Sequence, residues 1–189
     1  ILADKVYWEV VGNTFFIAFT AVIFQAIGGL ALALLLNQKI TGRNVFRGLI
    51  LVNWVIPLVV VSLLWMWIFD PEYGLFNYLM KTLHFIREYL PWLASPGTAK
   101  FAIILTQVWR GIPFMMVMFL AGLQTIPDDI VEAAEIDGAG LIARFLNITI
   151  PYLKQIAIIA TLLSVVRLFQ EFDIIYIMTG GGPLYSTTT

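Results

Sequence analysis

The sequence contains no cysteine and only one histidine among its 189 residues. Without cysteine the chain can form no disulfide, no thiolate metal site and no cysteine nucleophile. The phosphate-binding pattern G-x-x-x-x-G-K-[ST] is absent, and so are the hydrolase patterns H-E-x-x-H and G-x-S-x-G. The histidine, His84, has no sequence context that completes a catalytic triad. We therefore expect no enzymatic activity, no catalytic residue, no metal site and no bound cofactor in this chain.

Charged residues are also scarce, at 12% of the chain, whereas soluble domains carry about 25%. Hydrophobic residues make up 60%, and the mean hydropathy is +0.90. Too little polar surface remains to coat a water-soluble globule, so the lipid bilayer is the expected solvent. The net charge of −1 gives no sign of a nucleic-acid partner. The chain begins with Ile1 and shows no signal peptide, which we interpret as a piece of a longer protein.

Four apolar runs are long enough for membrane-spanning helices, which need about 20 mostly apolar residues. They cover residues 13–36, 47–69, 101–123 and 155–178. The first two runs are almost free of strongly polar groups, whereas the last two carry charged and amide side chains that are costly in lipid. The sequence therefore predicts an all-α membrane protein, a polytopic helix bundle that forms one transmembrane domain over residues 1–189.

The connecting segments predict an orientation for these spans. The short connection 37–44 carries Lys39 and Arg43 and no acid. Short loops rich in Lys and Arg stay in the cytoplasm. Because successive spans alternate in direction, residues 70–100 are then expected on the outer side and residues 124–151 in the cytoplasm.

The outer segment 70–100 is interrupted by prolines and glycines. Its middle part, residues 75–89, is expected to form a short interfacial helix. The apolar face predicted for that helix consists of Phe76, Leu79, Leu83 and Ile86.

Residues 124–151 are the most structured polar segment of the sequence. Asp128 follows Pro127 and is expected to cap a helix through its side-chain oxygen. That helix should end at Gly138, and a second short helix is expected over 141–148. Two short helices joined by a glycine bend are consistent with a docking element for a partner, or with an amphipathic hairpin that lies on the bilayer surface.

The spacing within this segment resembles a known motif. It reads Glu132-Ala133-Ala134, three residues, Gly138, nine residues, Ile148, one residue, and Ile150-Pro151. This pattern is similar to the EAA loop of binding-protein-dependent ABC importer permeases, in which a Leu normally precedes the final Pro. Further stretches look like the carbohydrate branch of that family, namely residues 109–114, 121–127, 172–176 and 179–183.

The resemblance implies the fold of a type I ABC importer permease core and the import of a sugar by alternating access. It implies a dimer of ABC ATPases that binds the ATP and Mg²⁺, a second homologous permease subunit, an extracytoplasmic solute-binding protein and membrane lipid as partners. It places the chain in the plasma or inner membrane of a bacterium or archaeon, with the EAA loop in the cytoplasm. The residues that it assigns to coupling with the ATPase are Asp128, Glu132, Ala133, Ala134, Asp137, Gly138, Ile148 and Pro151.

Polar side chains inside the last two apolar runs are candidates for a substrate pathway. Charges in a span normally face protein or a water-filled path, and helical spacing places these side chains on one face of each span. A common cavity is one interpretation, and packing is the other, with Arg167 paired to Glu171 or Arg110 paired to Glu171 or Asp173. The resemblance favours the cavity. The candidate pathway residues in these runs are Gln107, Arg110, Gly111, Ser164, Arg167 and Glu171. The resemblance adds Trp54, from the second run, as an aromatic contact for a sugar ring.

Three other functions stay open at this point. The first is an ABC importer for another small polar solute, such as an amino acid or an anion. The second is a secondary transporter in which Arg110, Glu171 and Asp173 form a proton or ion relay, and uptake that collapses with an ionophore would support it. The third is a membrane scaffold or enzyme subunit without transport activity, which recovery of the chain without any ATPase would support.

Overall fold

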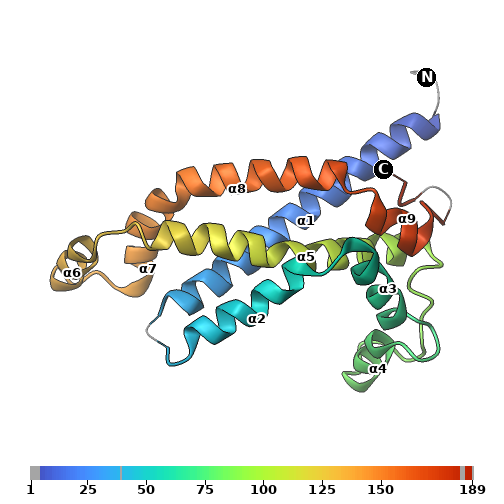
Figure 1. The fold of residues 1–189 in the computed structure, drawn as a ribbon, viewed down its shortest axis with the longest axis horizontal. Coiled ribbons are helices and arrows are strands. Elements are labelled where there is room, and N and C mark those ends of the chain that lie inside the picture. Colours follow the sequence, from blue (N-terminus) through green and yellow to red (C-terminus); the bar gives the residue numbers. More distant parts are fainter. Residues whose placement is uncertain (1–4, 39, 184–185, 189) are drawn as a thin grey trace. The chain divides into compact units, whose positions relative to one another are not determined.

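The computed structural model describes residues 5–38, 40–183 and 186–188, and within these residues the regular structure is helical, with no strand (Figure 1). The all-α prediction is confirmed. A short π-helical turn, Phe145–Thr149, joins two of the helices. In chain order the helices are α1 (Lys5–Asn37), α2 (Arg43–Val55), α3 (Leu58–Ile68), α4 (Leu75–Thr82), α5 (Pro96–Leu123), α6 (Asp128–Ile136), α7 (Leu141–Arg144), α8 (Ile150–Gln170) and α9 (Asp173–Thr179).

Within the described residues, three helical stretches are long and apolar enough to cross a membrane. They are α1, α5 and the stretch Leu141–Gln170, which runs through α7, the π-helical turn and α8. The bent pair α2 and α3 is a fourth candidate if the two helices count as one span. Lys39, on which the orientation partly depends, lies outside the described residues.

The structure differs from the uninterrupted span expected over residues 47–69. Helix α2 ends at Val55, α3 begins at Leu58, and the two are bent by 97°. Proline causes the break, because Pro57 has no N–H to donate and its ring disfavours a helical conformation at Ile56. Pro57 instead takes an extended conformation and precedes the first turn of α3.

The span expected over residues 155–178 is also interrupted. Helix α8 ends at Gln170, and α9 begins at Asp173 after a two-residue break. No proline or glycine lies at this break. Tertiary packing explains it, because α9 packs against α3 and buries Ile174, Ile175 and Met178.

Contacts divide the chain into two compact units. One unit contains Ile1–Ala21, Val55–Trp109 and Val165–Thr189, and we call it the aromatic unit. The other contains Val22–Trp54 and Arg110–Ser164, and we call it the hairpin unit. Helices α1, α5 and α8 contribute residues to both units, and so does α2 through its last residue, Val55.

The main buried cluster of the aromatic unit combines aromatic rings with aliphatic side chains. Partly buried Phe76 and Trp109 pack against its buried cluster, with the Phe76 and Trp92 ring centroids 4.8 Å apart. Aromatic rings contribute large buried areas and prefer such edge-to-face contacts. The buried members of the cluster are Val61, Trp65, Phe69, Trp92, Ala102, Ile174 and Met178.

The hairpin unit is held together by close helix contacts at glycines. A Cβ added at Gly29 of α1 would collide with Met115 of α5, and one added at Gly28 would lie 2.9 Å from Ile112. On α5, a Cβ at Gly122 would lie 2.6 Å from Leu153 of α8. Small residues at such positions let membrane helices approach closely, because van der Waals packing drives their association.

The segment predicted as an outer loop contains a shorter helix than expected. Helix α4 ends at Thr82, and His84 has a left-handed φ of 61° that stops the helix before residue 89. Phe76 and Ile86 pack against the aromatic cluster, whereas Leu79 and Leu83 are exposed. The apolar face predicted for residues 75–89 is therefore wrong in composition, because the chain turns before a continuous face can form.

Candidate functional site

The segment between α5 and α8 forms a helical hairpin, which we call the coupling hairpin (residues 124–151) after the role that the sequence predicts for it. Helix α6 is preceded by Pro127 in an extended conformation, and no side chain caps it. The cap predicted for Asp128 is therefore wrong, because Asp128 is already the first helical residue. Asp128 and Asp129 instead place two negative charges in the first turn, at the positive end of the helix dipole.

A glycine makes the bend of the coupling hairpin. Gly138 has a φ of +78°, and its N–H donates to the carbonyl of Glu135 at 3.0 Å. Ala139 donates back to the carbonyl of Ala134 at 2.9 Å. A left-handed residue of this kind is a common helix end, and glycine adopts it without the steric cost that a Cβ brings. Gly138 is thus where α6 stops and the chain reverses.

The second arm of the coupling hairpin is only partly α-helical. Helix α7 covers four residues and continues through the π-helical turn into α8. This arm is linked to the first by an ion pair, in which Arg144 donates to the carboxylate of Glu135. The link joins the two arms across the Gly138 bend.

The surface of the coupling hairpin is apolar at its tip and uncovered. Helices α6 and α7 and the π-helical turn contain no buried residue. Ile136 is 87% exposed, and Leu141 and Ile142 are each more than three-quarters exposed. Exposed apolar groups gathered in one place typically mark an interaction site.

The predicted coupling residues are spread along this hairpin rather than gathered in a cavity. Ala134 and Ile148 are half-buried. The other six are exposed, namely Asp128, Glu132, Ala133, Asp137, Gly138 and Pro151.

A hollow of about 470 Å³ lies beneath the coupling hairpin, within the hairpin unit. The end of α1 and the end of α5 form one side of it, and the two hairpin arms form the other. Near the hollow, Arg47 of α2 donates to the carbonyl of Leu36 at the end of α1 at 2.8 Å, and this hydrogen bond links α2 to α1. The residues that line the hollow are Leu34, Asn37, Gln38, Leu123, Ile126, Asp128, Val131, Leu141, Arg144, Phe145, Ile148 and Thr149.

Four of the candidate pathway residues lie in the hairpin unit. The ring of Trp54, at the end of α2, lies 6.2 Å from the ring of Phe114 on α5. Ser164 on α8 is buried, and its hydroxyl has no hydrogen-bond partner among the described residues. Arg110 is half-buried, and Gly111 is buried.

The other three candidates lie in the aromatic unit. Gln107 on α5 is buried, and Arg167 on α8 is half-buried. Glu171 is buried but follows the last residue of α8, so the helical spacing assumed between Arg167 and Glu171 ends there. The common cavity for all seven pathway residues stays a prediction.

Gln25, which was not among the predicted site residues, lies against one of them. This side chain is fully buried on α1, and a Cβ added at Gly111 would collide with its amide. Gly111 is therefore the residue that admits Gln25 between the two helices. The sequence does contain a signal for Gln25, because it is the one strongly polar residue in the interior of the apolar run 13–36.

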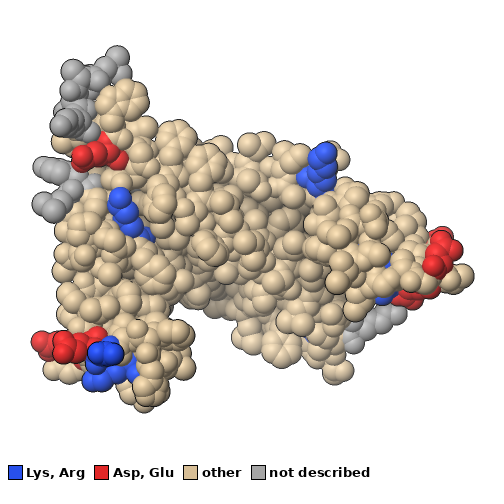
Figure 2. Space-filling view, turned by 180° about the vertical axis from the view of Figure 1, so that it is seen from behind, with Lys and Arg blue, Asp and Glu red and all other residues tan. Residues whose placement is uncertain are grey.

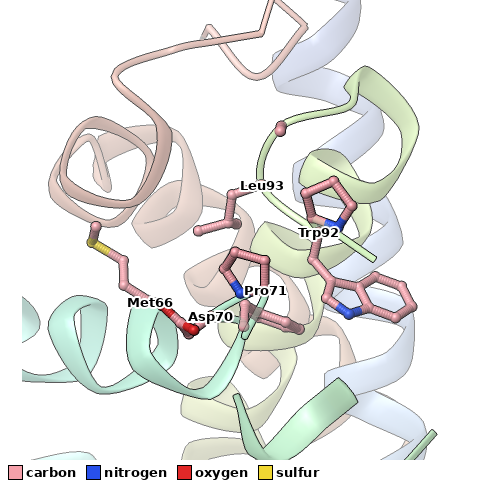
Figure 3. A pocket seen from close by; sticks show the side chains of 8 residues that line it. Met66, Asp70, Pro71, Trp92 and Leu93 are labelled. Atoms are coloured by element: carbon pink, nitrogen blue, oxygen red, sulfur yellow. The ribbon is translucent and has the colours of Figure 1, made fainter. Parts of the chain in front are cut away.

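A surface pocket of about 340 Å³ in the aromatic unit was not predicted. Figure 3 shows Met66, Asp70, Pro71, Trp92 and Leu93 around it. The Oδ1 atom of Asp70 accepts the backbone N–H groups of Glu72 and Tyr73 at 2.9 and 2.8 Å. The Asp70 carboxylate therefore holds the turn after α3 in place. Its presence in the pocket is explained by this structural role.

The helices and the coupling hairpin define a polytopic, all-α membrane protein. Comparison with known families then identifies it more closely, because residues 10–189 match the family described as the binding-protein-dependent transport system inner membrane component. The chain belongs to this family. The resemblance seen at the Glu-Ala-Ala pattern is thereby confirmed.

Several characterised relatives are permease proteins. The chain is 40% identical over 189 residues to the trehalose/maltose transport system permease protein MalF of Thermococcus litoralis, covering 100% of this chain and 63% of the relative. It is 43% identical over 186 residues to the sulfoquinovosyl glycerol transport system permease protein SmoG of Agrobacterium fabrum, covering 98% and 60%. It is 33% identical over 179 residues to the sn-glycerol-3-phosphate transport system permease protein UgpA of Yersinia pestis, covering 90% and 60%.

Solved structures share the fold. A bacterial ABC transporter that imports the acidic polysaccharide alginate superposes with a TM-score of 0.84 at 18% identity, covering 99% of this chain and 65% of that one. The same kind of transporter in complex with an alginate pentasaccharide-bound periplasmic protein gives 0.85 at 18% identity, covering 100% and 65%. The chain thus has the fold of an ABC importer permease core and spans less than two thirds of the length of these relatives.

Proposed function

We propose that the chain is the core of a permease subunit that imports a polyhydroxylated, sugar-like solute at the expense of ATP. The relatives support this substrate class, because their names include trehalose and maltose, sulfoquinovosyl glycerol, glycerol phosphate and alginate. Such solutes share a high density of hydroxyl groups, which buried amides and hydroxyls can bind. Gln25, Gln107 and Ser164 are buried side chains of this chemistry.

The proposed mechanism is alternating access driven by partner subunits. The sequence has no phosphate-binding loop of its own, so a dimer of ABC ATPases would hold the ATP and Mg²⁺. A second permease subunit would complete the pathway, and an extracytoplasmic binding protein would deliver the solute. The family description and the complex with a periplasmic protein support this set of partners. The proposed location is the plasma membrane of a bacterium or archaeon, with the coupling hairpin in the cytoplasm.

One observation carries the proposal: the coupling hairpin presents an uncovered apolar tip at a single glycine bend. Ile136 and Leu141 flank Gly138 and are exposed. An ATPase dimer that binds this tip can pass the movement of its own closure around ATP to α5 and α8, because the hairpin is continuous with both helices. Nucleotide and solute must favour different global states for such coupling to work.

The substitution Gly138→Asp tests the coupling role in the full-length, assembled complex. It places a charge and a Cβ at a left-handed position, although no atom of the described residues lies within 4 Å of that Cβ. We expect ATP-driven uptake to fall at least about tenfold, equivalent to about 1.4 kcal/mol of lost coupling, with the permease still inserted. Less ATPase should co-purify with it.

Gly97→Asp is the matched control, because Gly97 is also exposed and also has open space around an added Cβ among the described residues. It adds the same charge in the first turn of α5, away from any left-handed backbone. Uptake and ATPase recovery should match the unsubstituted protein. Normal uptake in Gly138→Asp would remove the coupling role. Uptake that persists without the ATPase and stops with an ionophore would favour a secondary transporter.

A further inference from the structure

Helix α4 is amphipathic, with Asn77 and Lys81 beside its apolar residues, and its apolar side chains are only partly covered. Phe76 and Met80 pack inward against the aromatic cluster, and the opposite face presents Leu75, Tyr78 and Leu79 to the outside, where all three are exposed. Large apolar side chains that are exposed side by side typically mark a surface that another apolar medium or partner covers. The described residues cover only one side of α4. We therefore expect the exposed apolar side chains on its outer face to be covered by something apolar outside the described part of the chain.

The outer face of α4 continues into a groove lined with exposed aromatic rings. The groove has a volume of about 390 Å³, and Tyr73 and Trp67 at its wall are 80% and 62% exposed. Phe85, just beyond α4, is 74% exposed. The groove is lined by Trp67, Glu72, Tyr73, Gly74, Leu75, Tyr78 and Tyr89.

These rings differ in kind from those of the buried cluster nearby in sequence. The buried cluster uses Phe69 and Trp92 within the core, whereas the exposed groove is rich in tyrosine, whose ring is apolar and whose hydroxyl is polar. Tyr and Trp are enriched at membrane–water interfaces, where one end of the side chain lies in an apolar layer and the other in water. The exposed set therefore has the composition of an interfacial belt.

Charged side chains accompany these rings without breaking up the apolar face. Lys81 places its Nζ 5.0 Å from the centre of the Tyr89 ring. Figure 2 shows acidic and basic side chains together over this part of the molecule, against a surface that is otherwise uncharged. Lys side chains near a membrane surface extend their charge into the headgroup layer while their stems cover apolar surface. Both signs of charge suit a layer of phosphate and amine groups.

We infer that residues 67–89, the α4 foot, lie in the headgroup layer of the membrane, with the outer face of α4 against phospholipid. The foot connects α3 to α5, one part of a bent candidate span to the next candidate span, so it lies where the chain leaves the apolar layer and returns to it. A water-soluble partner that docks here only transiently would leave Leu79, Phe85 and Tyr73 in water between encounters. Lipid covers them continuously, which recovers about 25 cal/mol for each Å² of apolar surface.

The absence of cysteine from this sequence makes the inference testable by site-directed spin labelling. Single cysteines at Leu79 and Phe85 are labelled in the full-length complex, with other cysteines of the complex removed. The complex is reconstituted in vesicles of phosphatidylethanolamine and phosphatidylglycerol. Collisions of each label with oxygen, which concentrates in lipid, and with a water-soluble nickel chelate are then compared. Glu88→Cys, an exposed charged position of the same foot, is the control.

We expect the ratio of oxygen to nickel collisions to be several-fold higher at Leu79 and Phe85 than at Glu88, with no binding protein present. Labels that the nickel chelate reaches freely, and that added binding protein protects, would assign the surface to that partner and overturn the inference. Labels that stay accessible under both conditions would also overturn it. The result is independent of the proposed function, which uptake by the same labelled complexes tests separately.

Discussion

The coupling hairpin and the α4 foot both expose large apolar side chains, but they are built in opposite ways. Helices α6 and α7 bury no residue, whereas α4 is fixed by the buried Asn77 and by the aromatic cluster. Segments with few buried contacts open at low free energy, and segments within a core open only with the whole fold. The two apolar surfaces therefore differ in how firmly the rest of the fold holds them, and we expect the hairpin to move more easily than the foot.

Asn77 explains why the foot is fixed. Its Nδ2 donates to the carbonyls of Asp70, Pro71 and Leu90 at 3.3, 3.2 and 3.0 Å. Its Oδ1 accepts from the backbone N–H of Leu90 at 3.1 Å and from the indole N–H of Trp92 at 2.7 Å. One side chain thus ties the turn before α4 to the chain that follows it.

The largest effect is therefore expected from Asn77→Ala. The change leaves the buried indole N–H of Trp92 without its acceptor, and each such loss costs about 1–3 kcal/mol. We expect the free energy of unfolding to fall by about 3 kcal/mol, measured as a lower thermal midpoint of the purified complex. Asn44→Ala, at an exposed position of α2, is the control. An unchanged midpoint in Asn77→Ala would mean that the foot is no more firmly held than the hairpin.

An intermediate effect is expected from Gly111→Ala, which tests how tightly the helices next to the coupling hairpin are packed, for comparison with the hairpin itself. The added Cβ collides with the amide of Gln25, and such overpacking costs about 1–3 kcal/mol. The thermal midpoint and the yield of assembled complex should both fall. Gly48→Ala is matched, because Gly48 is also helical and has open space around it among the described residues. Gln25→Ala should restore part of the loss; no rescue would contradict the steric explanation.

The smallest effect is expected from Glu135→Gln in the coupling hairpin. It removes the ion pair with Arg144, which is partly exposed, and pairs of this kind contribute about 0–1 kcal/mol. Hydrogen exchange should become faster within residues 128–149, while the thermal midpoint of the complex stays unchanged. A lower midpoint would show that the hairpin is part of the cooperative core, and the comparison with the foot would fail.

Local sequence signals predicted the features that depend on few residues. The length of the apolar runs predicted candidate spans, and the residue pattern around Gly138 predicted a hairpin bend that the structure contains. A left-handed bend needs only a residue without a Cβ, so its signal lies at one position. The polar residue Gln25 was visible in its run, but its contact with Gly111 required knowledge of which helices are neighbours.

Two prolines show where local signals end. Pro57 and Pro113 both lie inside apolar runs, yet the chain bends by 97° beside Pro57 and passes Pro113 within an unbroken α5. Proline removes the same hydrogen bond in both places. In membrane helices neighbouring elements decide whether the lost bond is tolerated, and Pro113 is fully buried among its neighbours. The packing of α3 against α9 accompanies the bend on the other side of Pro57.

Hydropathy and motif spacing are properties of the linear chain, and they were enough to identify a helical membrane protein of a binding-protein-dependent transport family. Local signals left open which helices break, which face of α4 is covered and which side chains contact Gln25. Those outcomes depend on contacts between residues far apart in the sequence, and no local pattern encodes the partner that a side chain will find.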